Sequence, residues 1–176
     1  MIEYPSIINS SKAPRGHCIA FVKFDGSNFR AKWTKKKGFD LFGSRRELID
    51  ESHKFLGESV RIFRKEYQSP LEELFRKNKE LRNEREIVVF GEFLGPNSFA
   101  GMHVTEDPKE LILFDVLVGH KNPRFIKPTE FIRMFQEVIK IPPVLYVGNM
   151  NDQFITDIRS GVYIYRRISS INRPSI

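Results

Sequence analysis

The sequence has a single cysteine, Cys18, and no long apolar segment. One cysteine cannot form an internal disulfide bond, which excludes a disulfide-stabilised domain and suits a reducing compartment. No apolar run approaches the roughly 18 residues of a membrane-spanning helix, and residues 1–15 lack the apolar centre of a signal peptide. Internal repeats and low-complexity segments are absent too. We therefore expect a cytoplasmic protein without a membrane partner.

The chain has instead an aromatic-rich composition and a surplus of positive charge. Its 176 residues are 40% hydrophobic and include 16 phenylalanines, enough for one domain with a sizeable core. Lysine and arginine total 29 against 22 acidic residues, a net charge of +7. Such a surplus favours a polyanionic partner, either nucleic acid or the phosphates of a nucleotide.

Lys23 ends the first apolar run and is followed directly by Asp-Gly-Ser-Asn. Residues 18–22 predict a buried strand, because a short unbroken apolar run fits the interior of a sheet. The next four residues predict a turn. Apolar residues then alternate with basic ones over residues 29–33, which predicts a returning strand. The simplest interpretation is a hairpin with Lys23 exposed beside its turn.

The rest of the chain alternates between predicted strands and helices. Further strands are expected over residues 39–43, 87–90, 111–118 and 144–148. Helical structure is expected over residues 47–83, in a helix that begins near residue 128, and over residues 152–158. Ser69-Pro70 predicts the start of a new helix, since a capping hydroxyl precedes a proline suited to the first turn. Thr129 is the expected cap of the helix near residue 128.

The segment from Lys23 to Asn28 resembles motif I of the covalent nucleotidyltransferases, and most closely that of RNA ligases of the phage and RNA-editing type. In that family the lysine amine attacks the α-phosphate of ATP, pyrophosphate leaves and a lysyl-AMP phosphoramide forms. The resemblance also assigns Asp25, Gly26 and Asn28 to the nucleotide site. A lysine amine is nucleophilic only when neutral, and its ordinary pKa is about 10.4. Burial, neighbouring cations or a metal ion would favour the neutral form.

Three companion motifs follow in the family's order. Arg45 resembles the arginine of motif Ia, which contacts the nucleotide or the nucleic acid through its planar fork of donors. Glu92, within Gly-Glu-Phe-x-Gly-Pro, resembles the motif III glutamate that accepts hydrogen bonds from the ATP ribose. Phe114 resembles the motif IIIa aromatic residue that stacks on adenine. The alternatives are an exposed arginine at a strand end, a loop glutamate and a core phenylalanine.

The last two motifs of the family are not found. Motif IV would read Glu-Gly-apolar-x-x-Lys, but Ser160 stands where its acid is sought, and Arg166 and Arg167 provide charge without an acid. We therefore expect a C-terminally incomplete adenylyltransferase domain over residues 1–162 and an atypical basic tail over residues 163–176. A truncated chain, a frameshifted gene and one half of a split enzyme all remain open. The metal ligands stay unassigned.

The resemblance implies an α+β nucleotidyltransferase (ATP-grasp-like) domain, with mostly antiparallel sheets flanked by helices and ATP between sheets. It implies an ATP-dependent RNA ligase in which Lys23 takes AMP and passes it to an RNA 5′-phosphate, before a 3′-hydroxyl displaces AMP. ATP and two Mg²⁺ ions are the expected cofactors. The alternative is a degenerate or split-enzyme fragment that binds nucleotide or RNA without full ligation and needs a second polypeptide carrying motifs IV and V. A DNA ligase or capping enzyme fits the motifs less well.

Overall fold

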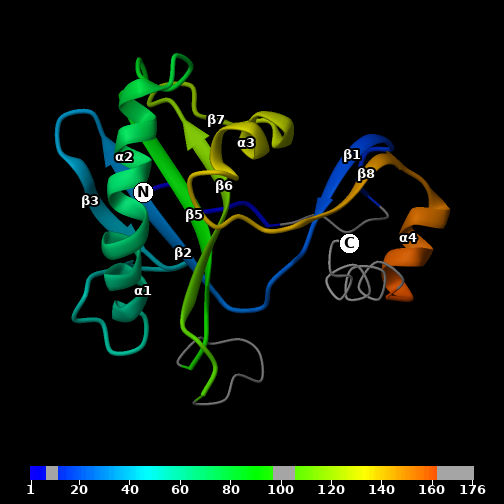
Figure 1. Ribbon diagram of the computed structural model, residues 1–176, viewed down its shortest axis with the longest axis horizontal. Helices are drawn as coiled ribbons and strands as arrows, with labels where there is room; N and C mark the ends of the chain where they lie inside the picture. The colour runs from blue at the N-terminus through cyan, green and yellow to red at the C-terminus, as the bar shows by residue number, and fades with distance from the viewer. Residues whose placement is uncertain (7–11, 97–105, 162–176) are drawn as a thin grey trace, which may run out of the picture. The chain divides into compact units, whose positions relative to one another are not determined.

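A computed structural model describes residues 1–6, 12–96 and 106–161 of the chain (Figure 1). The fold is α+β with antiparallel sheets, as the sequence predicts. Two compact units form: unit 1 is Met1–Pro5 with Lys23–Pro142, and unit 2 is Ser6–Val22 with Pro143–Ile176. Within the described ranges, no helix has both the length and the apolar character needed to cross a membrane. The expected basic tail over residues 163–176 lies outside the described residues.

Unit 1 is built on a six-stranded sheet with the order β4-β3-β2-β5-β6-β7, in which all neighbours are antiparallel. The two central strands pair over their whole overlap, from Ser27 opposite Phe93 to Thr34 opposite Glu86. The strands are β2 (Ser27–Thr34), β3 (Gly38–Gly43), β4 (Leu48–Ile49), β5 (Glu86–Leu94), β6 (Glu110–Val118) and β7 (Arg124–Phe125).

A continuous run of helix covers one face of this sheet (Figure 1). It consists of α1 (Gly57–Ile62), the π-helical turn η1 (Phe63–Tyr67) and α2 (Gln68–Lys77). Aromatic side chains make the interface, with ring centroids 5.3 Å apart for Phe29 and Phe63 and 5.4 Å apart for Trp33 and Phe75. Burial of these large rings is the main stabilisation of the unit, because each removes much apolar surface from water.

The helical region begins later than its sequence pattern predicts, and it contains no new start at Ser69-Pro70. Leu48 and Ile49 form the short strand β4, while both Ser69 and Pro70 lie inside α2. Proline lacks a backbone N–H and so cannot make the usual helical hydrogen bond. The π-helical turn immediately before it changes the bonding pattern there, so the helix continues.

The helix α3 (Pro128–Phe135) is present, but Thr129 is not its cap. Lys127 occupies the N-cap position with extended backbone and without a capping side-chain bond, and Pro128 follows it in the first turn. The fixed φ of proline, which suits the first helical position, therefore sets this start.

The predicted hairpin around Lys23 is wrong. In unit 2, β1 (Gly16–Phe21) pairs with β8 (Val144–Met150) in a separate two-stranded sheet, and β1 is half-buried rather than buried. β2 has β3 on one side and β5 on the other, so neither of its edges is open to β1. The helix α4 (Asp152–Arg159) completes the described part of unit 2, and its Phe154 ring stacks on Tyr146 at 4.1 Å.

Candidate functional site

The candidate site lies where β2 begins and β5 ends, within unit 1. Asn28 of β2 is directly opposite Glu92 of β5, so their side chains project from the same face of the sheet. Gly26, just before β2, donates its backbone N–H to Oε1 of Glu92 at 3.0 Å. Two predicted motifs that are more than sixty residues apart in the chain are therefore in direct contact.

Glu92 is the electrostatic centre of this cluster. Its burial raises the pKa of the carboxyl, and the hydrogen bond from Gly26 and the charges of Lys23 and Arg45 oppose that rise. Asp25 adds to the rise by repulsion. Because each of these groups acts on the Glu92 carboxyl, the structure brings the predicted residues of motifs I, Ia and III together. The sequence interpretation of Glu92 as a loop residue is wrong, since it belongs to β5.

Only glycine fits at position 26. A Cβ atom built there would overlap the carbonyl oxygen of Phe93 and lie 2.8 Å from Cδ2 of Leu94. The absence of a side chain thus lets the backbone come close enough for the Gly26–Glu92 hydrogen bond. This contact fixes the orientation of the Glu92 carboxylate and leaves its remaining acceptor positions for a ligand.

Asn28 carries a buried polar atom that lacks a partner. Its Oδ1 is removed from solvent and accepts no hydrogen bond from the described residues. A buried acceptor without a donor costs about 1–3 kcal/mol, so such an atom points to a missing partner. A hydroxyl or amino group of a bound nucleotide would supply the donor.

Lys23 lies in the short connection between β1 and β2 and is exposed. Its Nζ donates to the backbone carbonyl of Phe24 at 3.4 Å, a long hydrogen bond. The amine is therefore accessible from solvent, beside the Glu92 cluster.

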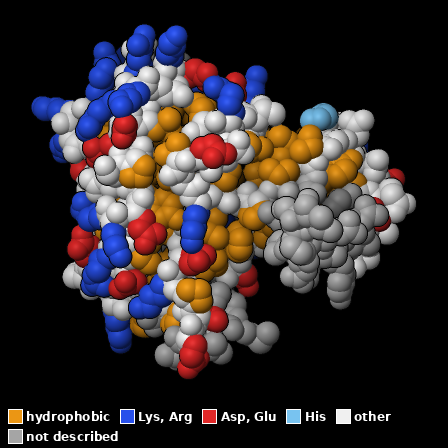
Figure 2. Space-filling view, in the orientation of Figure 1, with side chains coloured by type: hydrophobic (Ala, Val, Ile, Leu, Met, Phe, Trp, Pro, Cys, Tyr) orange, Lys and Arg blue, Asp and Glu red, His pale blue; other side chains and the backbone are white. Residues whose placement is uncertain are grey.

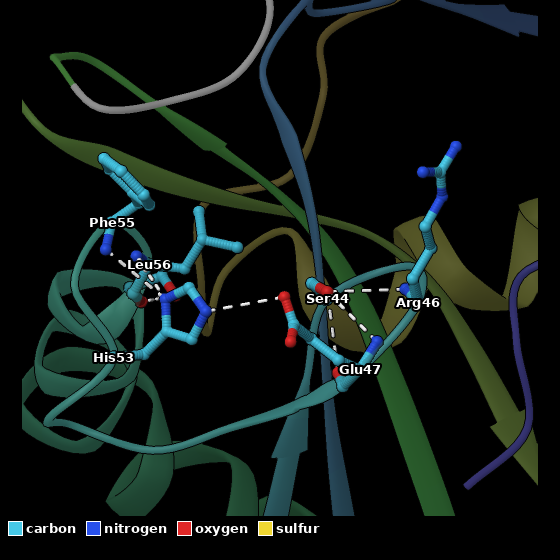
Figure 3. Close-up of polar contacts among 7 residues, drawn as sticks. Ser44, Arg46, Glu47, His53, Phe55 and Leu56 are labelled. Atoms are coloured by element: carbon cyan, nitrogen blue, oxygen red, sulfur yellow. Dashed lines mark hydrogen bonds and ion pairs between the residues drawn. The ribbon is translucent and has the colours of Figure 1, made fainter.

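Arg45 is an exposed residue of the bend that follows β3, and Figure 3 shows its neighbours Ser44 and Arg46. Ser44 N–H donates to the carbonyl of Glu47 at 2.9 Å, and the hydroxyl of Ser44 accepts the N–H groups of Arg46 and Glu47. His53 supports the turn, because its Nε2 is 3.5 Å from Oε1 of Glu47. In Figure 3 the exposed side chain of Arg46 points away from these hydrogen bonds, and Arg46 takes part in them only through its backbone N–H.

Phe114 lies on β6 where the pairing with β5 shifts register. Its half-buried ring packs against the cluster of Val88, Phe90 and Leu117. Val88, Phe90 and Glu92 alternate along β5, so Phe114 lies over the same face of the sheet as Glu92. The ring belongs to an apolar cluster and is also incompletely covered, so stacking of Phe114 on adenine stays a prediction.

Tyr4 and Asp115 form a contact that the sequence analysis missed. The Tyr4 hydroxyl donates to Oδ2 of Asp115 at 2.9 Å, and its ring meets that of Phe114 edge to face at 4.9 Å. Burial raises the pKa of Asp115 to about 6. The N-terminal segment is held in place by Arg30, whose Nη1 donates to the carbonyl of Ile2 at 2.9 Å. Nothing local in the sequence signals a contact between residues 111 positions apart.

A shallow hollow also lies over η1 and α2, away from the predicted motif residues. Its lining includes Glu72, Glu73, Arg76 and Lys77. These four pair with one another, at 2.7 Å for Arg76–Glu72 and 2.6 Å for Lys77–Glu73. The charges in this hollow are therefore already neutralised, and we assign it no ligand.

The residues of the candidate site fit a nucleotide better than a metal ion held by protein alone. The unpaired Asn28 oxygen, the Glu92 acceptor and the cations Lys23 and Arg45 match the donors, hydroxyls and phosphates of a nucleotide. Across residues 1–6, 12–96 and 106–161, no group of three or more His, Cys, Asp or Glu side chains could hold a metal.

Comparison with curated proteins finds no match. Solved structures of Naegleria gruberi RNA ligase are similar to the chain. A mutant with ATP and Mn has a TM-score of 0.56 and 17% identity over 80% of this chain and 38% of its own. A mutant with AMP and Mn has a TM-score of 0.53 and 16% identity over 76% of this chain and 37% of its own.

At these identities the likeness establishes the fold, a nucleotidyltransferase-type α+β arrangement, and the chain spans less than two-fifths of the length of these solved ligases. A family model described as RNA ligase matches residues 16–172, which is nearly the entire chain and extends past residue 162, the expected end of the adenylyltransferase domain. The chain belongs to the RNA ligase family.

Proposed function

We propose that this chain is the adenylyltransferase part of an ATP-dependent RNA ligase, with Lys23 as its nucleophile. The observation that carries the proposal is the hydrogen bond from Gly26 to the half-buried carboxyl of Glu92, a carboxyl on which the charges of Lys23 and Arg45 also act. These residues come from three separate segments of the chain. A buried carboxylate among cations, beside an unpaired amide oxygen, is typical of a ligand site.

In the proposed step, the neutral amine of Lys23 attacks the α-phosphorus of ATP. A P–N bond forms, the bond between the α-phosphorus and the bridging oxygen breaks, and pyrophosphate leaves with that oxygen. The nitrogen loses its proton to solvent, which its exposed position allows. AMP is then joined to the enzyme as a phosphoramide.

The other residues bind and orient the nucleotide in this proposal. Glu92 accepts from the ribose hydroxyls, Asn28 accepts one further donor, and Arg45 contacts phosphate. Phe114 stacks on the adenine, which contributes about 1–3 kcal/mol when a base meets an aromatic ring. Gly26 serves by holding the Glu92 carboxylate in one orientation.

A divalent metal ion is part of the proposal, since the similar solved ligases carry ATP or AMP with Mn. Mg²⁺, the ion we expect, would neutralise phosphate charge. Because the described residues offer no carboxylate cage, phosphate oxygens and water would provide most of its ligands.

The later steps involve RNA ends. AMP passes to an RNA 5′-phosphate, and a 3′-hydroxyl then displaces AMP to seal the strands. A second candidate is a fragment that binds nucleotide without full ligation and works with a second polypeptide. The chain spans 37–38% of the length of the similar solved ligases, which is compatible with this second candidate.

The first experiment is incubation of the purified protein with α-labelled ATP and Mg²⁺, followed by mass measurement of the denatured protein. We expect one covalent AMP on the native protein and none on Lys23→Ala. Lys65→Ala, which removes an exposed lysine from η1, is the matched control and keeps the adduct. Equal labelling of the native protein and Lys23→Ala refutes the proposal.

The second experiment separates the two candidates. The AMP-charged protein is given 5′-phosphorylated RNA with an adjacent 3′-hydroxyl on a complementary strand. A complete ligase seals the strands and releases AMP. A fragment that retains the first step alone keeps the adduct without sealing.

A further inference from the structure

Positive charge gathers at the end of the unit 1 sheet that is farthest from the candidate site. Ten exposed lysines and arginines from three segments form what we call the basic pole: Lys35, Lys36, Lys37, Arg76, Lys77, Lys79, Arg82, Arg85, Lys121 and Arg124. Lys and Arg side chains crowd this end, at the top of the view in Figure 2.

Hydrogen bonds join these segments into one surface. Lys35, in the turn between β2 and β3, donates its backbone N–H to the carbonyl of Arg85 at 3.2 Å and its Nζ to the carbonyl of Arg82 at 3.1 Å. Arg124 of β7 pairs with Glu84 of the same α2–β5 connection at 3.6 Å. The three segments are therefore fixed side by side within unit 1.

The basic pole is separate from the candidate site. Along the paired strands β2 and β5, Asn28 and Glu92 lie at the end with the candidate site, whereas Thr34 and Glu86 lie at the end with the basic pole. The two positions are six residues apart on each strand, and a rise of about 3.3 Å per residue gives a distance of about 20 Å.

Most of the charge at the pole is not neutralised by acids. Asp40, Glu72, Glu73 and Glu84 pair with four of the ten cations. The nearby acids Glu80 and Glu86 pair with cations outside the pole, Arg133 and Lys32.

Six cations have no carboxylate partner among the described residues: Lys35, Lys36, Lys79, Arg82, Arg85 and Lys121. The pole therefore carries six unpaired cations on one surface, where an ordinary solvated surface intersperses its cations with acids.

We propose that the basic pole is a second RNA-contact surface, which holds backbone phosphates of the strand whose end lies at Lys23. The identification of the polyanion as RNA rests on the proposed function. Several unpaired cations spread over three segments match a row of phosphates better than one nucleotide. At about 3.4 Å per phosphate in a stacked strand, 20 Å corresponds to about six phosphates.

The test compares two triple variants with the same loss of charge. The pole variant is Lys36→Ala, Arg82→Ala and Arg85→Ala, and the control variant is Lys12→Ala, Lys65→Ala and Lys140→Ala, all exposed positions elsewhere. Binding of a fluorescent, 5′-phosphorylated 20-nucleotide RNA is measured by anisotropy between 50 and 200 mM salt. Formation of the AMP adduct is measured in parallel.

We expect the pole variant to reduce the slope of log K against log salt by about 2, since each lost contact with a single strand contributes about 0.7. The control variant should keep the slope, and both should form the adduct at the native rate. An unchanged slope in the pole variant, or an equal loss in both, overturns the inference. The inference is also overturned if polyglutamate of equal charge displaces the fluorescent RNA as effectively as unlabelled RNA does. If the pole variant reduces the slope but the native protein forms no AMP adduct, the proposed function is refuted and the pole remains an RNA-binding surface.

Discussion

At the residue scale, Glu92 shows how much of the site depends on one hydrogen bond. The Gly26 N–H donates a hydrogen bond to one oxygen of the Glu92 carboxylate. Burial makes the negative charge of this carboxylate costly unless cations or donors of a ligand interact with it. Glu92 and Asn28 therefore share a need for donors that the protein alone does not fill. This shared need is the physical basis for predicting nucleotide binding here.

Glu92→Gln tests that basis. Glutamine can still accept from the Gly26 N–H, but its amide nitrogen donates where the carboxylate accepted from ribose. A lost hydrogen bond to a charged group is worth about 1.5–3 kcal/mol, so adduct formation at limiting ATP should slow about tenfold or more. Thermal stability should stay near the native value. Glu84→Gln, at the opposite end of the sheet, is the control; a native adduct rate in Glu92→Gln would remove Glu92 from the site.

The resemblance to the RNA ligase motifs singled out Lys23, Arg45, Glu92 and Phe114 in order, but the sequence could not show which of them lie together. The contact between Gly26 and Glu92 depends on the β2–β5 register, which is set by pairing between segments some sixty residues apart. The unpaired Asn28 oxygen is likewise a property of packing, which a sequence does not display.

At the scale of elements, apolar patterning predicted strands close to β1, β2, β3, β5, β6 and β8 and helices close to α2, α3 and α4. The sequence pattern gave wrong predictions where contacts with neighbouring strands or turns determine the structure. The hairpin was wrong because β2 has a partner on each side, and the helix start at Ser69 was wrong because a π-helical turn carries the helix past Pro70.

The N-terminal segment is another element whose place follows from distant contacts. Tyr4 packs against rings from three strands: Phe90 of β5, Phe114 of β6 and Phe125 of β7. Its hydroxyl reaches Asp115, next to Phe114. The segment thus covers part of the sheet face that carries the candidate site, and Asp115 makes that cover sensitive to pH.

Asp115 gives a pH prediction with a defined sign. Its pKa of about 6 in the folded protein exceeds the ordinary value of 3.8, so the folded state retains a proton between these values that the unfolded state has lost. The free energy of unfolding therefore falls as pH rises from about 4 to 6. Above that range the buried charge costs up to about 3 kcal/mol.

Asp115→Asn should remove this cost, because its amide oxygen can still accept from the Val116 N–H and its amide nitrogen can donate to the Tyr4 hydroxyl oxygen. We expect higher stability than native at pH 7.5 and a flatter profile between pH 4 and 6, measured by urea unfolding. Asp40→Asn, an exposed acid paired with Lys37, should leave the profile unchanged. A native-like pH profile in Asp115→Asn would show that Asp115 is not the group responsible.

At the scale of the whole molecule, the two units differ in how they are stabilised. Unit 1 has a six-stranded sheet and a large aromatic core, whereas the described part of unit 2 has two strands and one helix. Two-stranded sheets are marginal in water unless another element covers them. Phe154 of α4, stacked on Tyr146 of β8, makes that cover, and Asn151 caps the helix by accepting the Phe154 N–H at 2.8 Å.

Phe154→Ala should therefore unfold unit 2 locally and leave unit 1 intact. Loss of a buried phenylalanine costs about 3 kcal/mol, which corresponds to about 100-fold faster hydrogen exchange at the β1 and β8 amides, up to the limit set by the unit's own stability. Amides of β5 and β6 should keep their native protection. Val147→Ala, which trims an exposed apolar side chain of β8, is the control and should change neither. Equal losses in β1–β8 and β5–β6 would mean that the chain unfolds as one cooperative block. Loss confined to β1–β8 means that local opening of unit 2 can occur while the Glu92 cluster and the basic pole stay folded, because both belong to unit 1.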